Sequence, residues 1–488
     1  MSIQSIDAAA TVRRSVIWLL LFSIPVLVSM EPVTDWDIWW HLRVGQWILA
    51  HGQVPHVDVF SAYGAGKPWI AYSWLFEVLV FLLHRQFGLL GIVGFNVAMT
   101  LAIAVALYIS VRQASLPILA EVALVGTAVI AMVPIYTPRP WAFTVLFFVL
   151  ELHCIFTARR LRQPWRLYFL APLFVLWANL HIQFIYGLAV FGLYIGELLL
   201  ARIQALVSPV SRDGAQPQLG KIVPIVFACL VSTLINPYGF KIYQPVFEYI
   251  EFTGAFQIVS ELLPLSFVNV ADWLVGWLLL VAVFVLGWQR RWLAFPSALL
   301  LASAVLGMRA RRDVWIAAVS AVMIIAQLRS FLPCVERCRW NWLNFGLVGV
   351  GLSVTILVVA HQWEISTARL QQAVKNIYPV DAVAYIKEKR LTGPLYNHFN
   401  WGGYLIWALP EMPVSMDGRT NLHGDDRIIR SVDTWLGRTG WESDPELARS
   451  RLVIAHPKQP LASLLRADER FRLVYEDKTA LLFVAKGS

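Results

Sequence analysis

Two aspartates near the start of the chain have the residue type and surroundings for acid–base chemistry. Asp35 and Asp37 lie in the stretch DWDIWWHLRVGQWILAHGQVPHVD, residues 35–58, among four tryptophans. A carboxyl group held near such low-dielectric surroundings has a raised pKa, which suits it to act as a general base. If residues 37–50 form a helix, Asp37 and His41 lie one turn apart on the same side. A simpler interpretation is that the aspartates only cap the N-terminus of this helix, a position that aspartate favours.

A run of arginines is the second candidate. The stretch GMRARRD, residues 307–313, contains Arg309, Arg311 and Arg312. The topology expected for the chain places this run outside the cytoplasm, although Lys and Arg usually gather on the cytoplasmic side. Three guanidinium groups there would form a cradle for a phosphate group, which arginine binds through paired hydrogen bonds. The alternative is that the topology is inverted at this point and the arginines are ordinary cytoplasmic charges.

Other polar residues near the expected outer membrane surface are candidates for contact with a substrate. Asn179 and His181 lie in WANLHIQF, where a span meets the outside, and Arg139 lies in TPRPW on the same side. A lone histidine in such a place is more often a hydrogen-bonded structural residue. Glu77 lies inside the second apolar segment, where an ionisable group is costly and is therefore expected to face a cavity.

Metal ligands are also available in residues 35–58, which contain three aspartates and three histidines. No spacing among them matches a closed structural zinc site. A single divalent ion bound between an aspartate and a substrate phosphate is compatible with the sequence, so the cofactor stays open.

Membrane helices must position these residues. The 488 residues are 58% hydrophobic with a mean hydropathy of +0.61, and several runs near twenty residues are almost free of charge. Such runs are long enough to cross a bilayer, so the chain is a polytopic membrane protein. Its net charge of +9 is explained by basic cytoplasmic loops and does not call for nucleic acid. Twelve apolar segments lie at about 14–31, 72–86, 89–110, 116–135, 141–158, 167–180, 183–203, 221–235, 271–288, 292–308, 313–332 and 342–361.

The charges in the loops predict the topology. Arg13 and Arg14 place the N-terminus in the cytoplasm, so residues 31–72 emerge on the outer side. An even number of crossings must join two outer loops, yet three apolar segments lie between residues 72 and 136. One of them is therefore not a full span. We expect an all-α bundle of about eleven transmembrane helices, within a range of eleven to thirteen.

The C-terminal part has the composition of a soluble domain. Of the 40 basic and 31 acidic residues of the chain, 32 lie after position 361. Short apolar stretches there are typical of strands (GPLYNHF, PVSMDGR, RLVIAH, FRLVYED and ALLFVAK), and others are typical of helices (PVDAVAYIKEKR, NWGGYLIWAL and QPLASLLRAD). We expect two domains: a transmembrane domain at 1–361 that includes the exported loop 31–72, and an extracytoplasmic α/β domain at 362–488.

The exported loop resembles that of a known family. An acidic pair straight after the first span, GQWILAHGQVP, and then GKPWIAYSWLFEV before the second span resemble the type-C (GT-C) glycosyltransferases. KPW, with Lys67 and Trp69, is similar to a Lys-Pro element of lipid A aminoarabinose transferases and protein mannosyltransferases. In the tail, PLYNHFNWGGYLIW and MDGRTNLHG resemble the C-terminal part of uncharacterised bacterial membrane proteins grouped with these enzymes.

This resemblance implies a function in the bacterial inner membrane. An inverting enzyme would move a sugar from a polyprenyl-phosphate carrier to an acceptor outside the cytoplasm, with an aspartate of the first loop as the base. The acids here depart from the Asp-Glu pair that is common in the family, so Asp35 and Asp37 both stay candidates. The residues expected to bind the substrate are His41, Lys67, Trp69, Glu77, Arg139, Asn179, His181, Arg309, Arg311 and Arg312.

Two other classes of function compete. One is a non-catalytic membrane subunit of a larger complex that retains the fold, with the C-terminal domain binding a partner protein. The other is a transporter, which would need paired polar residues deep in several spans, whereas the spans here are mostly apolar.

Overall fold

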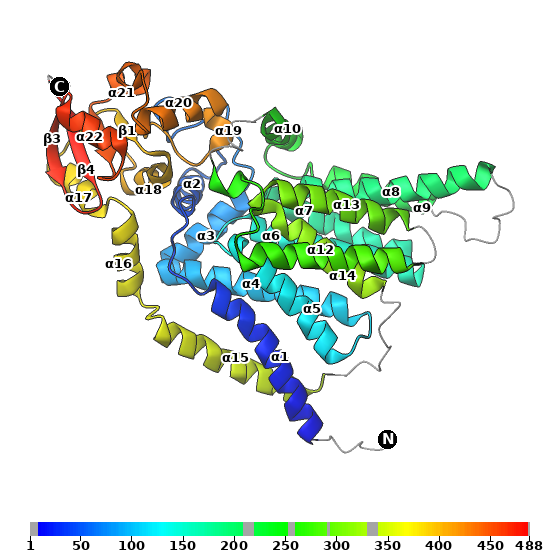
Figure 1. Cartoon of the computed structure of the whole chain (residues 1–488). Coiled ribbons are helices and arrows are strands. Elements are labelled where there is room, and N and C mark those ends of the chain that lie inside the picture. Colours follow the sequence, from blue (N-terminus) through cyan, green and yellow to red (C-terminus); the bar gives the residue numbers. More distant parts are fainter. Residues whose placement is uncertain (1–7, 208–218, 252–258, 290–292, 329–339, 487–488) are drawn as a thin grey trace. The chain divides into compact units, whose positions relative to one another are not determined.

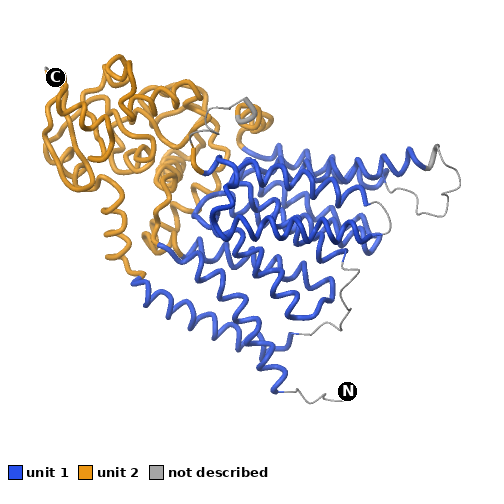
Figure 2. The backbone as a smooth tube through the Cα atoms, viewed as in Figure 1, with its two compact units in different colours: residues 1–31, 94–236, 261–364 blue, residues 32–93, 237–260, 365–488 orange. Residues whose placement is uncertain are grey.

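The computed structural model describes residues 8–207, 219–251, 259–289, 293–328 and 340–486 (Figure 1). The described chain is mostly helical, with one four-stranded sheet near the C-terminus. Its contacts form two compact units, coloured separately in Figure 2. Unit 1 comprises residues 1–31, 94–236 and 261–364, and unit 2 comprises residues 32–93, 237–260 and 365–488.

Each of the twelve apolar segments expected from the sequence contains a helix in the described residues. Residue 292 and residues 329–332, at the ends of two of these segments, lie outside the described ranges. The twelve helices are α1 (Ala8–Ser29), α3 (Trp74–Phe87), α4 (Leu89–Arg112), α5 (Ile118–Ala131), α6 (Trp141–Leu161), α7 (Leu170–Leu180), α8 (Phe184–Val207), α9 (Leu219–Ser232), α12 (Val270–Trp288), α13 (Ala294–Arg309), α14 (Val314–Gln327) and α15 (Trp342–Gln362).

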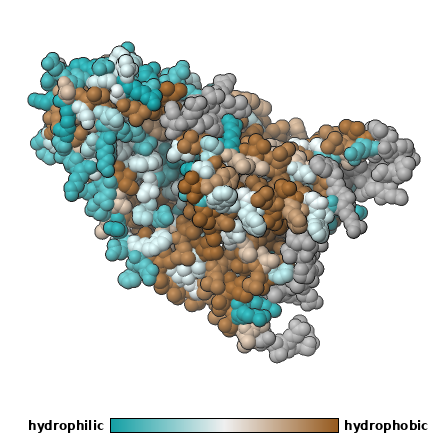
Figure 3. Space-filling view, in the orientation of Figure 1, coloured by the Kyte–Doolittle hydropathy of each residue, from teal (hydrophilic) through white to brown (hydrophobic). Residues whose placement is uncertain are grey.

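Helix length and composition identify the membrane-spanning elements. Among the described residues, six helices are long and apolar enough to cross a bilayer (α1, α4, α6, α8, α12 and α15), and α5, α9 and α13 are shorter apolar helices. Hydrophobic residues cover much of the visible face of the unit 1 helices (Figure 3). The chain is therefore a multi-pass membrane protein. The number of eleven crossings stays a prediction. Helix α14, for example, has 14 residues, whereas a helix that spans a bilayer usually has about 20.

The interior of unit 1 is built around α14. All its residues from Val314 to Ala326 are buried, as expected for a helix that is apolar on every side. It packs against α5, α6, α12 and α13. The 3-10 turn η6 (Arg311–Asp313) connects α13 to α14 and carries two of the candidate arginines.

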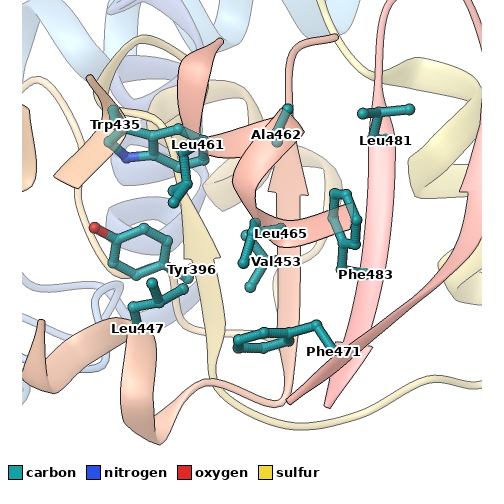
Figure 4. Close-up of a cluster of buried hydrophobic side chains, with 11 residues drawn as sticks. Tyr396, Trp435, Leu447, Val453, Leu461, Ala462, Leu465, Phe471, Leu481 and Phe483 are labelled. Atoms are coloured by element: carbon teal, nitrogen blue, oxygen red, sulfur yellow. The ribbon is translucent and has the colours of Figure 1, made fainter. Parts of the chain in front are cut away.

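Unit 2 contains a mixed sheet in the order β1-β2-β4-β3. Strand β1 (Leu395–Asn397) is parallel to β2 (Leu452–Ala455), and β4 (Leu481–Ala485) is antiparallel to both β2 and β3 (Phe471–Glu476). Buried side chains from the strands, α20 (Asp425–Trp435) and α22 (Pro460–Ala467) form its core (Figure 4). Each large apolar side chain buried there stabilises the fold by roughly 1.5–3 kcal/mol.

The strand and helix patterns of the tail coincide with these elements, with one difference. The stretch PVSMDGR forms no named strand: Val414 makes only isolated bridges, with Ser61 and Leu395. Pro413 has no N–H to donate to a ladder, and side chains rather than a strand partner hold the residues that follow. The remaining elements of unit 2 are α2 (Ile38–His51), η4 (Gly239–Tyr243), α10 (Gln244–Glu251), α16 (Thr367–Ile377), α17 (Val380–Glu388), α18 (Phe399–Ala408), α19 (Thr420–His423), η7 (Trp441–Ser443) and α21 (Pro445–Arg449).

The exported loop folds with the tail, whereas we expected it to belong with the transmembrane domain. Helix α2 packs against α18, and Gly403 of the NWGGY motif lies at this contact, whereas Gly402 lies against Met416 and Asp417. A Cβ on Gly403 would lie 2.6 Å from the carbonyl oxygen of Trp36, and one on Gly402 would lie 2.0 Å from that of Met416. Only glycine permits this close approach. The first loop and the C-terminal domain therefore position one another.

Candidate active site

The two aspartates of the first loop make different contacts. Oδ1 of Asp35 accepts hydrogen bonds from the backbone N–H groups of Asp37 (2.9 Å) and Ile38 (3.2 Å) at the start of α2. Asp35 is buried, and the hydroxyl of Tyr378 donates to its carbonyl oxygen at 2.9 Å. Free N–H groups at a helix N-terminus need such acceptors. Asp35 thus has the capping role that the simpler interpretation expected.

Asp37 is at the N-cap position of α2, but its side chain does not cap the helix. The carboxylate is partly exposed and lies against Gly418 of the MDGRTNLHG motif. A Cβ on Gly418 would be 1.9 Å from Oδ1 of Asp37 and 2.8 Å from its Cγ. The absence of a side chain at position 418 therefore makes room for this carboxylate.

His41 is paired with Glu77. Its Nδ1 lies 3.3 Å from Oε1 of Glu77, and both side chains are buried. The imidazole ring packs on the indole of Trp40, with 3.6 Å between centroids, while the His41 N–H donates to the carbonyl oxygen of Asp37 at 3.2 Å. The predicted turn between Asp37 and His41 is present, and the His41 side chain contacts the next helix, α3.

A buried charge cluster, made by Asp58, Asp417, Arg419 and His423, lies beside Gly418. Arg419 donates from Nη1 to Oδ1 of Asp58 and from Nη2 to Oδ2 of Asp417, both at 2.7 Å, and these side chains are 0–1% exposed. Nε2 of His423 lies 3.3 Å from Oδ2 of Asp417. Burial alone raises the pKa of Asp417, but Arg419 and His423 outweigh it and hold that pKa well below its ordinary value.

Sequence reasoning missed this cluster. The sequence predicts a strand-like stretch at PVSMDGR and offers Asp58 only as a possible metal ligand. It does not pair Asp58 with Arg419, because these residues are 361 positions apart. The signal available in the sequence was an Asp and an Arg that directly follow an apolar stretch.

Two predicted binding residues lie near this cluster. Trp69 packs against it: the guanidinium of Arg419 lies 4.7 Å from the centre of the Trp69 ring. Lys67 is exposed, and its backbone carbonyl accepts from the N–H of Asp58 at 2.9 Å.

The arginine run lies in unit 1, around η6. Arg309 ends α13, and Nη2 of Arg311 donates to the hydroxyl of Ser266 at 2.6 Å. Nε of Arg312 is 3.9 Å from Oδ2 of Asp313. Asp313 also accepts hydrogen bonds from Gln183 (2.9 Å) and Tyr186 (3.2 Å), two residues that sequence reasoning missed. The structure thus places the Asp313 carboxylate close to Arg312, and the charge of Arg309 also acts on it.

The remaining predicted residues of unit 1 have identifiable partners. Nδ1 of His181 lies 2.9 Å from the hydroxyl of Thr144, and burial, with the charge of Arg312 acting in the same direction, lowers its pKa to about 3. Nδ2 of Asn179 donates to two backbone carbonyls, each at 2.7 Å, which is a structural role. Arg139 lies 3.4 Å from Glu261 and over the ring of Trp141. The arginine run therefore acts on His181, because the charge of Arg312 contributes to its lowered pKa.

The predicted site residues divide equally between the units. Asp35, Asp37, His41, Lys67, Trp69 and Glu77 lie in unit 2, and Arg139, Asn179, His181, Arg309, Arg311 and Arg312 lie in unit 1. Among the described residues, no group of three or more His, Cys, Asp or Glu side chains could hold a metal ion. A divalent ion shared between one aspartate and a substrate phosphate stays a prediction.

Neither a protein-family model nor a curated protein sequence matches the chain. Solved structures that are similar to it include the following three. The apo oligosaccharyltransferase of Archaeoglobus fulgidus matches with a TM-score of 0.52 and 11% identity, over 93% of this chain and 70% of that one. The arabinofuranosyltransferase AftD from Mycobacteria matches with a TM-score of 0.49 and 13% identity, over 99% and 40%. ArnT from Cupriavidus metallidurans, bound to undecaprenyl phosphate, matches with a TM-score of 0.40 and 14% identity, over 99% of both chains.

At these identities the comparison concerns the fold alone, and the likeness to the archaeal oligosaccharyltransferase, with a TM-score above 0.5, supports it. The chain has a GT-C-like fold, as the sequence resemblance implied.

Proposed function

We propose that this protein is a membrane glycosyltransferase that moves a sugar from a polyprenyl-phosphate carrier to an acceptor outside the cytoplasm. The observation that carries the proposal is the placement of Asp37. Its carboxylate is partly exposed, does not cap α2, and has a space kept open for it by Gly418. The GT-C-like fold and the resemblance of the first loop support the same function.

Asp37 is the proposed base. Its carboxylate takes the proton of the acceptor hydroxyl as the acceptor oxygen forms a bond to the anomeric carbon. The bond from that carbon to the carrier phosphate breaks at the same time, and the phosphate leaves with the electron pair. Attack from the face opposite the phosphate inverts the anomeric configuration. Asp35 is less suited to this role because one of its oxygens already accepts two backbone hydrogen bonds.

Arg309, Arg311 and Arg312 are the proposed ligands of the carrier phosphate. The leaving phosphate gains negative charge as the glycosidic bond breaks, and positioned guanidinium groups stabilise that charge. Two features support this role: the charges of Arg309 and Arg312 both act on Asp313, and Nε of Arg311 is buried without a hydrogen-bond partner among the described residues.

The test of the base is transfer by purified protein in lipid nanodiscs, supplied with a panel of radiolabelled prenyl-phosphate sugars. Asp37→Asn keeps the shape of the side chain and removes the base, so transfer should fall by about 10²-fold or more. Asp381→Asn, on the exposed surface of α17, is the matched control and should stay active. Full transfer by the Asp37→Asn variant contradicts the assigned base. Folded wild-type protein that neither transfers nor hydrolyses any sugar lipid, and that co-purifies with one large complex, supports the non-catalytic alternative.

A further inference from the structure

A pocket of about 230 Å³ in unit 2 contains none of the residues to which the proposed transfer reaction assigns a role. Three segments line it: the residues around Lys67 and Trp69, helix α10 with Gln244 and Glu248, and helix α19 with Asn421. The first segment precedes α3 in the exported loop, and the last follows the DGR turn of the tail. Distant parts of the sequence therefore form one concave surface.

Hydrogen bonds hold the three walls together. The hydroxyl of Tyr238, just before the turn η4 that leads into α10, donates to the carbonyl oxygen of Pro55 at 2.8 Å and accepts from the N–H of Ala71 at 3.1 Å. Asn421 follows Arg419, which is anchored on Asp58 in the same loop. The pocket is built from elements whose positions other contacts fix, as expected of a preformed binding site.

Glu248 is the central polar group of the pocket. Its Oε1 accepts from Nε2 of Gln244 at 2.8 Å, and its Oε2 accepts from Nδ2 of Asn421 at 3.4 Å. Each carboxylate oxygen has a second acceptor site, and each carboxamide keeps another N–H and its own oxygen. Hydrogen-bond donors and acceptors therefore alternate around the Glu248 carboxylate, which Gln244 and Asn421 hold in one orientation.

This lining matches the chemistry of a sugar. A hydroxyl group both donates and accepts, as the carboxamides do, and two neighbouring hydroxyls can donate to the two oxygens of one carboxylate. The apolar walls, made by Pro68, Pro245 and Leu422, suit the C–H groups of a sugar ring. Lys67 and Glu248 both line the pocket, so their opposite charges offset one another and the lining matches a neutral ring better than an anion. One carboxylate is too few for a three-ligand metal site.

We propose that this pocket binds one neutral saccharide ring, with Glu248, Gln244 and Asn421 as its hydrogen-bonding residues. The inference rests on the proposed function, because the ring belongs to the donor or to the acceptor of the transfer. It adds sugar-binding residues that are distinct from the base Asp37.

The test is saturation-transfer NMR on the full chain in nanodiscs, with glucose, galactose, mannose, arabinose, N-acetylglucosamine and glucuronate as probes. At least one neutral sugar should bind, and glucuronate should bind more weakly. Glu248→Gln and Asn421→Ala should each weaken binding by about tenfold. Gln372→Ala removes an exposed carboxamide on α16 and should leave binding unchanged. No saturation transfer from any neutral sugar, or unchanged binding in Glu248→Gln, overturns the proposal.

Two further measurements separate this proposal from the proposed function and identify the source of the sugar. Asp37→Asn should abolish transfer while sugar binding stays intact, and a protein that binds sugar but never transfers it contradicts only the enzymatic function. If the pocket holds the donor sugar, a citronellyl-phosphate sugar should bind more tightly than the matching methyl glycoside. If it holds the acceptor sugar, the methyl glycoside should bind at least as tightly.

Discussion

The Cα of Gly418 lies so close to the Asp37 carboxylate that a Cβ at position 418 would be 1.9 Å from Oδ1. This relationship connects the exported loop, which supplies the proposed base, to the tail, which leaves the space for it. Asp417 and Arg419, on either side of this glycine, belong to the buried charge cluster. The geometry of the proposed base therefore depends on residues about 380 positions away.

Gly418→Ala tests this dependence. Gly418 does not have a left-handed backbone conformation, so alanine is allowed there, and its methyl group should displace the Asp37 side chain rather than unfold the domain. A misplaced base should lower sugar transfer by about 10²-fold. In a protein that already carries Asp37→Asn, Gly418→Ala should lower sugar transfer no further. Gly94→Ala, where a Cβ meets nothing within 4 Å, is the control. If the two substitutions lower sugar transfer independently, so that their effects multiply in the double variant, Gly418 does not act by positioning Asp37.

Removal of the cap at α2 should separate the roles of the two aspartates. Asp35→Ala loses two backbone hydrogen bonds and should lower the stability of unit 2 by about 1 kcal/mol. The Asp37 side chain makes no capping hydrogen bond, so the midpoint of thermal unfolding of Asp37→Ala should stay closer to that of the wild type. Tryptophan fluorescence on heating measures both. A larger loss of stability in Asp37→Ala would reverse the assignment.

Arg419→Met should be far more damaging than the loss of a surface ion pair. It leaves Asp58 and Asp417 buried without their counter-charge, which costs about 3–5 kcal/mol. Arg438→Met breaks the ion pair with Asp433, whose side chains are 64% and 39% exposed, and should cost less than about 1 kcal/mol. Equal unfolding midpoints for the two variants would contradict a structural role for the cluster.

The stability of unit 2 should decrease as the pH falls from 6.5 to 4. Burial, with the charge of His456 acting in the same direction, lowers the pKa of His398 from 6.5 to about 4. Between these values the unfolded chain binds a proton that the folded chain does not, so acid favours unfolding. The ring also accepts the N–H of Asn400 as the N-cap of α18. His398→Asn keeps a capping oxygen without a titration, so its unfolding midpoint should depend less on pH in this window; an unchanged pH slope would exclude His398 as the cause.

Neutralising the arginine run should weaken binding of undecaprenyl phosphate. With Arg309, Arg311 and Arg312 changed to Gln, the loss should be at least about tenfold, and the remaining binding should depend less on salt. Asp313→Asn removes the carboxylate beside Arg312 and should strengthen binding, so this control has the opposite expected effect. Binding that survives the triple substitution would remove the proposed phosphate ligands.

Local patterns in the sequence predicted most of the apolar helices and strands, although PVSMDGR formed no strand. Every apolar segment, from residues 14–31 to 342–361, contains a helix, and the strand patterns of RLVIAH, FRLVYED and ALLFVAK became β2, β3 and β4. Runs of apolar residues and the alternation of apolar with polar residues depend only on neighbours in the sequence, so they can be recognised without knowledge of the fold. The helix expected at 37–50 was also present, as α2 at Ile38–His51.

The tertiary structure decided which polar groups meet. Asp35 and Asp37 are equivalent in the sequence, and only the backbone geometry at the start of α2 gives the capping bonds to Asp35 and the space beside Gly418 to Asp37. The pairing of Arg419 with Asp58 could not be predicted either, because a buried charge needs a partner in close contact, and folding alone brings that partner from 361 positions away. Sequence determines which stretches fold into most of the helices and strands, while long-range packing determines which carboxylate lies beside Gly418.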